Sequence, residues 1–288
     1  MAGEMTDLVL SEIPIYVGKS KEVFEIIGGD FKGKYAFFYS DRATGWRDSK
    51  TGEIHFDPGY DNVVGEIRGS GAISCKVAKF FFEELNKKGI ISHYIATAND
   101  NTLIVEPAIP IGMKARSNFE GAAPLQNLEF TWRNQFMGSA VRRYPFLQPC
   151  GYAKNLAVEA WTKGKSDTLI TFEVLEAAGV MTKKEISYTQ NLVKDIAGVV
   201  TDIFHEKGLH VIDGKFELGR LKEGSGEIVL IDEISPAVLR VCNGYKPNES
   251  RDCLAAGDCI ETRVIDNKLK IKAKNQVDEK EIARILGI

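Results

Sequence analysis

The sequence predicts an α+β fold whose N-terminal part is rich in β-strands. Short apolar segments separated by glycine turns follow one another over residues 14–40. Two longer segments, 70–88 and 183–207, repeat their apolar residues with the 3.6-residue period of a helix. Two apolar strands, 211–219 and 227–233, are joined by a short turn. Together these elements place the chain in the α+β class.

The N-terminal elements follow from local patterns. Residues 14–26 and 35–39 are typical of two strands joined by a glycine turn. The polar stretch 41–69 is rich in glycine and aspartate, and we expect a long surface loop there, of a length that is usually functional. A helix over 70–88 ends at Gly89. The further strands expected in the first half of the chain are 93–96, 102–106 and 128–133.

The clearest helix of the chain begins with a capping box, Thr182-Lys-Lys-Glu185. An amphipathic pattern follows, and Gly208 ends the helix. The helix leads directly into the predicted strand 211–219. A short alternating strand over 269–274 and a final helix over 278–286 close the chain.

Composition limits the class of protein. The 288 residues are 44% hydrophobic and 27% charged, which is typical of a globular protein with one large domain or two lobes. A net charge of −3, with both signs interspersed, argues against nucleic acid or an anionic membrane as the main partner. No apolar run reaches the roughly 18–20 residues of a membrane span. The acidic N-terminus lacks a signal-peptide pattern, so we expect a cytoplasmic protein. Five widely spaced cysteines without a Cys-x-x-Cys pair indicate reduced thiols rather than disulfides or a zinc site.

The densest set of polar residues lies on the predicted hairpin. Because successive side chains of a strand point to opposite faces, Asp213, Lys215 and Glu217 share one face. Asp232 and Glu233 end the partner strand, directly after an apolar run. Carboxylates held beside a core need a cation or ligand to neutralise them, so the hairpin predicts an active site more than a solvated surface. Glu217 and Asp232 are the candidate Mg²⁺ ligands, since Mg²⁺ binds one or two carboxylates together with phosphate oxygens.

Two other segments carry groups suited to phosphate. Gly18-Lys-Ser-Lys21 combines a flexible backbone with two lysines that suit a polyphosphate, although a solvated hairpin also explains it. Arg133 comes shortly before Gly138-Ser139, and Arg142-Arg143 follow. A guanidinium with a glycine–serine turn, which adds a hydroxyl and an exposed N–H, suits phosphate; a basic helix face explains the segment equally well. Arg240 follows the acidic pair Asp232-Glu233 and can reach back to the polar residues of the same hairpin. None of the four histidines is assigned a catalytic role.

In order and approximate spacing these motifs resemble the SAICAR synthetase family over about residues 14–240. The motifs are Gly18-Lys-Ser-Lys21, Ser40-Asp-Arg42, Arg133-Asn with Gly138-Ser139, Asp213-Gly-Lys-Phe-Glu-Leu-Gly219, and Asp232-Glu-Ile-Ser-Pro with Arg240. The resemblance implies two lobes with ATP between them: a β-rich nucleotide-binding lobe over 1–100 and an α/β catalytic and substrate-binding lobe over 101–288. It implies an ATP-dependent ligase of purine biosynthesis, which joins L-aspartate to carboxyaminoimidazole ribonucleotide and yields SAICAR, ADP and phosphate.

The resemblance also implies which residues bind which ligands, and all of these ligands are small molecules. It allows a homo-oligomer. The residues implied to meet the ATP phosphates are Lys19 and Lys21. The residues implied to hold Mg²⁺ are Glu217 and Asp232. Those implied to lie beside the reacting groups, together with these two carboxylates, are Asp213 and Lys215. Those implied to bind the ribonucleotide 5′-phosphate are Arg133, Ser139 and Arg240. Asp41 and Arg42 are implied to bind substrate as well.

Two segments depart from the family pattern. Ala237-Val238-Leu239 stands where the family usually has an acid, a small residue and a serine, and 162–167 lacks the family's His-Asp pair. Apolar replacements beside the expected substrate pocket predict a different ligand. A paralogous ligase acting on another amine or carboxylate is therefore one alternative. A non-catalytic nucleotide-binding regulator is another, against which the intact Lys21, Glu217 and Asp232 argue; a phosphotransferase rests on fold analogy alone.

Overall fold

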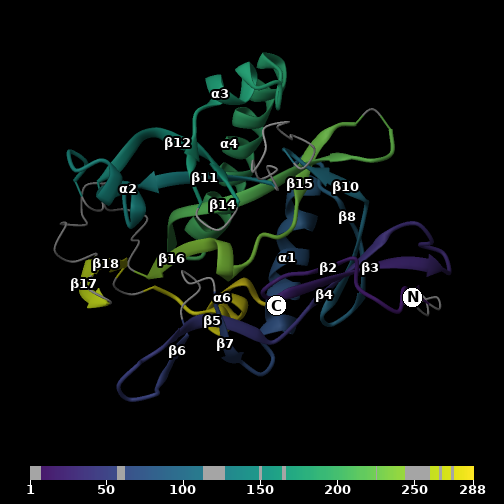
Figure 1. The fold of residues 1–288 in the computed structure, drawn as a ribbon, viewed down its shortest axis with the longest axis horizontal. Coiled ribbons are helices and arrows are strands. Elements are labelled where there is room, and N and C mark those ends of the chain that lie inside the picture. Colours follow the sequence, from purple (N-terminus) through teal and green to yellow (C-terminus); the bar gives the residue numbers. More distant parts are fainter. Residues whose placement is uncertain are drawn as a thin grey trace, which may run out of the picture.

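The structure is a computed structural model that describes residues 8–56, 62–112, 127–148, 151–163, 167–224, 226–243, 260–265, 268–273 and 276–288. Two main sheets dominate it, one built from the N-terminal third of the chain and one from the remainder (Figure 1). Cys150, Cys253 and Cys259 lie outside the described residues.

The N-terminal sheet has six strands in the order β1-β3-β4-β9-β8, with β2 also paired to β3. Its strands are β1 (Val9–Leu10), β2 (Tyr16–Val17), β3 (Lys21–Gly28), β4 (Tyr35–Tyr39), β8 (Tyr94–Asn99) and β9 (Thr102–Val105). Helix α1 (Ser70–Lys87) packs on this sheet and buries one apolar side, including Val77, Phe81 and Leu85. The β8–β9 hairpin crosses residue 100, so this sheet extends to Val105.

The expectation of a long surface loop over 41–69 is wrong. The segment forms β5 (Arg42–Arg47), which pairs with β6 (Ile54–Phe56) on one side and β7 (Val63–Glu66) on the other. This small sheet projects from the lower side of the molecule in Figure 1. Trp46 stacks on His55 across it, with ring centroids 4.2 Å apart. Short strands interrupted by glycine show little alternation, and cross-strand pairs that the sequence does not reveal stabilise them.

The C-terminal sheet has seven strands in the order β10-β14-β11-β12-β13, and β15 and β16 also pair with β14. Its strands are β10 (Ala108–Pro110), β11 (Leu128–Gln135), β12 (Tyr152–Thr162), β13 (Leu169–Ile170), β14 (Leu209–Leu221), β15 (Ile228–Ile231) and β16 (Leu239–Asn243). The 13-residue strand β14 therefore has four partners and lies at the centre of this sheet. The predicted hairpin is its pairing with β15.

Helices cover one face of this sheet and leave the other to polar residues. Helix α4 (Lys183–Glu206) packs on β11, β12 and β14 through Ile196 and Val200, which meet Phe130 and Phe216 in one buried cluster. The other helical segments are α2 (Ser139–Arg143), α3 (Phe172–Ala177), the 3₁₀ turn η1 (Pro236–Val238) and α6 (Glu279–Leu286). A separate hairpin consists of β17 (Ile260–Ile265) and β18 (Lys268–Ala273). Among the residues described, none of the helices is both long and apolar enough to cross a bilayer.

The capping box of α4 forms as predicted, and we expect its loss to be measurable. The Thr182 hydroxyl accepts from the backbone N–H of Glu185 at 3.2 Å, and the Glu185 carboxylate accepts from that of Thr182 at 2.7 Å. Thr182→Ala should lower the free energy of unfolding by about 1 kcal/mol, or the melting temperature by about 2–4 °C for a chain of this size. Thermal unfolding measures this against Lys184→Ala, an exposed residue in the same turn. Equal melting temperatures for both variants would contradict it.

Candidate active site

The uncovered face of the C-terminal sheet carries the predicted polar residues. The register places Asp213 opposite Arg133 and Glu217 opposite Glu129 on the neighbouring strand β11. Lys215 lies between them, with its Nζ 2.9 Å from Glu129 Oε2. The structure thus brings the three polar residues of β14 onto one face, as strand alternation predicts. We call this surface the polar face.

A buried lysine joins the two sheets at one end of the polar face. Lys21 opens β3, and its Nζ lies 2.6 Å from both Asp232 Oδ1 and Glu233 Oε1. Burial disfavours its charge, but the two carboxylates raise the pKa of Lys21 above its ordinary value. Asp232 has a φ of +69°, the one positive value among the described residues other than glycine, so its backbone is strained at this position. Lys19, by contrast, is exposed in the turn before β3.

Glu217 lies beside Asp232 and is largely buried. Lys163 Nζ and the side-chain amide of Asn127 contact its carboxylate. Burial, and then the charge of Asp232, raise the pKa of Glu217 to about 7. Sequence reasoning missed Asn127 altogether and noted Lys163 only as part of a divergent segment. The raised pKa means that burial, together with the charge of Asp232, disfavours the ionised form of Glu217, which a bound cation would favour.

Two neighbouring carboxylates supply the hard, negatively charged oxygen donors that a divalent cation such as Mg²⁺ prefers. Among the described residues, no group of three or more His, Cys, Asp or Glu side chains is placed to hold a metal. An ion at Glu217 and Asp232 would therefore take its remaining ligands from phosphate oxygens or water, which is the usual coordination of Mg²⁺ in phosphoryl-transfer sites.

Glu217 should make stability depend on pH. Because its pKa in the folded protein is about 7 and lies above the ordinary carboxyl value, the folded state binds the proton more tightly than the unfolded state. This contribution to the free energy of unfolding is largest below about pH 4.5, declines up to about pH 7 and is then constant. We expect Glu217→Gln to remove this decline, which urea titrations at pH 5, 6, 7 and 8 measure. Burial also raises the pKa of Glu279 to about 7. Its contribution to the pH dependence of stability remains in Glu217→Gln and is tested separately by Glu279→Gln. A wild-type-minus-variant difference that is constant with pH would contradict the assignment.

The other end of the polar face holds arginines. Asp213 lies between Arg133, whose Nη1 is 2.6 Å from Oδ2, and Arg240, whose Nε is 3.0 Å from Oδ1. A Cβ on Gly138 would lie 3.0 Å from Arg240 Nη1, so this glycine makes room for the guanidinium immediately before Ser139 begins α2. The structure thus brings Arg133, Arg240 and the turn before Ser139 together. Asp213 contacts the guanidiniums of this end.

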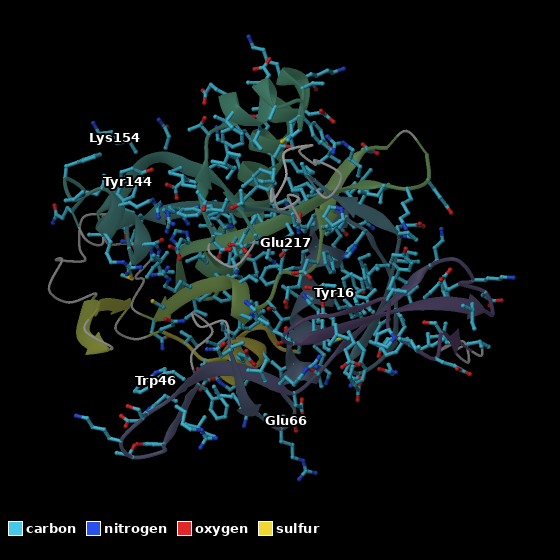
Figure 2. The ribbon with its side chains drawn as sticks, viewed as in Figure 1. Tyr16, Trp46, Glu66, Tyr144, Lys154 and Glu217 are labelled. Carbon is cyan, nitrogen blue, oxygen red and sulfur yellow. The ribbon has the colours of Figure 1, made fainter. Side chains whose placement is uncertain are left out.

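The two ends are separated along one strand. Asp213 and Glu217 are four residues apart on β14, which corresponds to about 13 Å at about 3.3 Å per residue. Figure 2 shows Glu217 near the middle of the molecule, and Tyr144, directly after α2, toward its edge. Lys215 lies between the ends.

Asp41 and Arg42 have contacts away from the polar face. The Asp41 carboxylate accepts from the N–H groups of Gly69 and Gly71, at 2.9 and 3.0 Å, and so caps the first turn of α1. Arg42 Nη2 lies 3.2 Å from Glu22 Oε1 on β3. These contacts connect β5 and α1 to the N-terminal sheet.

The apolar segment after the acidic pair mostly faces the core. A Cβ on Gly214 would lie 2.7 Å from Leu239 Cδ2 and 2.9 Å from the Trp132 ring, so the glycine accommodates both side chains. Leu239 is buried and Val238 packs on the same core, whereas Ala237 is exposed. The expectation that all three residues alter a substrate pocket is therefore wrong for Leu239. Strand alternation gives the polar face to its neighbour Arg240.

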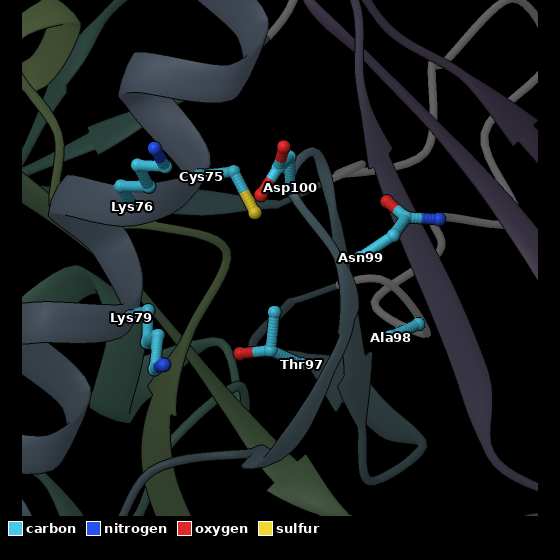
Figure 3. Close-up of a pocket in the computed structure, with 7 residues that line it drawn as sticks. All are labelled: Cys75, Lys76, Lys79, Thr97, Ala98, Asn99 and Asp100. Carbon is cyan, nitrogen blue, oxygen red and sulfur yellow. The ribbon is translucent and has the colours of Figure 1, made fainter. Parts of the chain in front are cut away.

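A pocket of about 240 Å³ lies between α1 and the end of β8 (Figure 3). Cys75, Lys76 and Lys79 of α1 line one side, and residues 97–100 line the other. Burial raises the pKa of the Cys75 thiol to about 12, which makes it a poor nucleophile. The pocket contains none of the polar-face residues.

A family model described as SAICAR synthetase matches residues 14–254. The chain belongs to the SAICAR synthetase family. A relative from Clostridium tetani named phosphoribosylaminoimidazole-succinocarboxamide synthase is 32% identical over 239 residues, which cover 82% of this chain and 93% of the relative. A relative of the same name from Persephonella marina is 27% identical over 261 residues, which cover 88% of this chain and 94% of the relative.

Solved structures of SAICAR synthetases share the fold. A structure described as SAICAR synthetase (Type-2) in complex with ADP matches with a TM-score of 0.61 and 25% identity, over 79% of this chain and 83% of that one. The phosphoribosylaminoimidazole-succinocarboxamide synthase of Ehrlichia chaffeensis matches with a TM-score of 0.65 over 80% and 85%; its 20% identity shows the fold alone. The predicted family and α+β fold are thereby confirmed, and the family is one of ATP-dependent ligases.

Proposed function

We propose that this SAICAR synthetase family member joins L-aspartate to carboxyaminoimidazole ribonucleotide and converts ATP to ADP and phosphate. The observation that carries the proposal is the polar face with two chemically different ends on one strand. At one end, the carboxylates of Glu217 and Asp232 and the lysines that contact them suit a metal-bound polyphosphate. At the other, the guanidiniums around Asp213 suit a phosphate monoester. A substrate with a phosphate at one end and a reacting carboxylate toward the other fits between them.

At the ATP end, Glu217 and Asp232 would hold Mg²⁺, which when bound supplies charge neutralisation for phosphoryl transfer. Lys21 and Lys163 already carry positive charge at these carboxylates. Exposed Lys19 in the preceding turn is near enough in sequence to reach the same phosphates. We assign nucleotide binding to the N-terminal lobe, expected over 1–100 and extended by its sheet to Val105, and catalysis and substrate binding to the rest of the chain.

At the other end, Arg133, Arg240 and the Ser139 hydroxyl would bind the 5′-phosphate and thereby place the substrate carboxylate near Lys215. A carboxylate is a poor acyl donor, so its phosphorylation by ATP creates a leaving group. The Lys215 ammonium, which is half-exposed beside Glu129, would oppose the negative charge on the acyl phosphate. Attack by the amine then expels phosphate, and the site contributes mainly through positioning.

One observation favours a second candidate. Ala237 is exposed where the family usually has an acid, so the partner of that acid would be different here. A paralogous ligase with the same ATP chemistry and another amine or carboxylate would account for this change.

Release of ADP by the purified protein tests the proposal. The assay contains Mg-ATP, carboxyaminoimidazole ribonucleotide and L-aspartate, and each is omitted in turn. Turnover that requires all three establishes the reaction. Binding of ATP without such turnover rejects this substrate pair and favours the paralogous ligase, for which other amines are then assayed.

A further inference from the structure

A carboxylate outside every sequence motif lies at the centre of the arginine end. Glu159, in the middle of β12, has a side chain that is 14% exposed. Its Oε2 lies 3.3 Å from Arg133 Nε, and both of its oxygens accept from Arg143 Nη2 at 2.9 Å. The hydroxyl groups of Tyr144 and Thr131 each donate to it at 3.3 Å. Glu159 therefore connects Arg133 to a second arginine.

Arg143 is held in place by its surroundings. Its Cζ lies 4.3 Å from the ring centroid of Trp161 and 5.1 Å from that of Tyr144. The indole N–H of Trp161 donates to Thr131 at 3.1 Å, which fixes the ring on which the guanidinium stacks. Arg143 Nε is buried and, among the residues that the structure describes, has no hydrogen-bond partner. The hydrogen bonds that this guanidinium makes to other described residues go to Glu159, through Nη2.

The charges of the cluster show what Arg143 contributes. Three guanidiniums, those of Arg133, Arg143 and Arg240, surround the carboxylates of Asp213 and Glu159. The cluster therefore has a net charge of +1. Without Arg143 the net charge would be zero, and Arg133, already paired with Asp213, would be the guanidinium of this cluster left in contact with Glu159. Glu159 would then compete with a phosphate for that guanidinium and repel the phosphate as well.

We propose that Arg143, paired with Glu159, is a positioning residue of the phosphate subsite. It neutralises Glu159 so that Arg133 remains available to a phosphate monoester. The inference rests on the proposed function in one respect: it takes Arg133 and Arg240 as the guanidiniums that bind the substrate phosphate. The inference predicts that loss of Arg143 weakens phosphate binding because it leaves the charge of Glu159 without this partner.

Charge-matched variants test this prediction. Arg143→Gln should weaken the binding of ribose 5-phosphate, followed by calorimetry, and raise the KM for the phosphorylated substrate, each by about tenfold or more, without changing the KM for ATP. Arg143→Gln combined with Glu159→Gln should recover most of the affinity, because no unpaired carboxylate remains. Arg142→Gln, which alters the exposed neighbour, is the matched control and should bind like the wild type.

The outcomes separate this inference from the proposed function. A purely structural role for Arg143 would lower stability and would not be rescued by Glu159→Gln, so a double variant as weak as the single one overturns the inference. Unchanged binding of ribose 5-phosphate by Arg143→Gln also overturns the inference, even where the ligase assay succeeds. The inference is likewise overturned if the wild type does not bind ribose 5-phosphate. If the ligase assay fails while the variants behave as expected, the subsite stands and the proposed reaction does not. Should Arg143→Gln not fold, Arg143→Lys keeps the charge and should bind nearly as well as the wild type; a loss of tenfold or more would contradict compensation by charge.

Discussion

Asp232→Asn is expected to lower the rate of ADP formation by on the order of 10³-fold while the protein stays folded. Asp232 and Glu217 are the carboxylates that would hold Mg²⁺, and Asp232 is also one of the two partners of Lys21 at 2.6 Å. Asparagine has the shape of aspartate and tolerates the positive φ of +69° at this position, so the backbone need not change. The loss of one negative charge would weaken binding of the metal–nucleotide complex and displace Lys21.

Single-turnover ADP release at saturating substrates measures this effect, and thermal unfolding checks the fold. The matched control is Glu223→Gln, which removes a 74%-exposed carboxylate 3.0 Å from Lys34. We expect that variant to retain wild-type turnover, since exposed ion pairs contribute little. Rates for Asp232→Asn within about twofold of the wild type would remove the Mg²⁺ assignment.

The second large effect is expected at Arg133. Arg133→Lys keeps the charge but loses the planar fork that contacts Asp213 at 2.6 Å. It should raise the KM for the phosphorylated substrate by about 10- to 100-fold, which corresponds to one charge-assisted hydrogen bond, and leave the KM for ATP unchanged. Arg133→Ala should in addition lower the free energy of unfolding by about 1.5–3 kcal/mol, because Asp213 and Glu159 would each lose one buried partner while keeping Arg240 and Arg143.

Initial rates with each substrate varied in turn separate these two constants. Arg220→Lys is the control for losing part of an arginine–carboxylate pair outside the site, since Arg220 Nη2 lies 2.7 Å from Glu185 Oε1. Its KM values should both equal those of the wild type. Equal increases in both constants for Arg133→Lys would count against a role in the phosphate subsite.

The amino-acid sequence by itself determined the features that depend on close neighbours in the chain. The capping box of Thr182 and Glu185 joins residues three apart, and the shared face of Asp213, Lys215 and Glu217 follows from the two-residue period of a strand. The ordered motifs also predicted the family, because each keeps its local pattern.

Only the tertiary structure decided which distant residues meet at the site. Lys163 is 54 residues from Glu217 and Asn127 is 90 from it, while Glu159 is 26 from Arg133. The pairing of β5 with β6 and β7, and the burial of Leu239 beside Gly214, likewise depend on strand neighbours that no local pattern specifies. The physical reason is that a buried charge or side chain takes its partner from whatever element the fold packs against it, and that partner can come from anywhere along the chain.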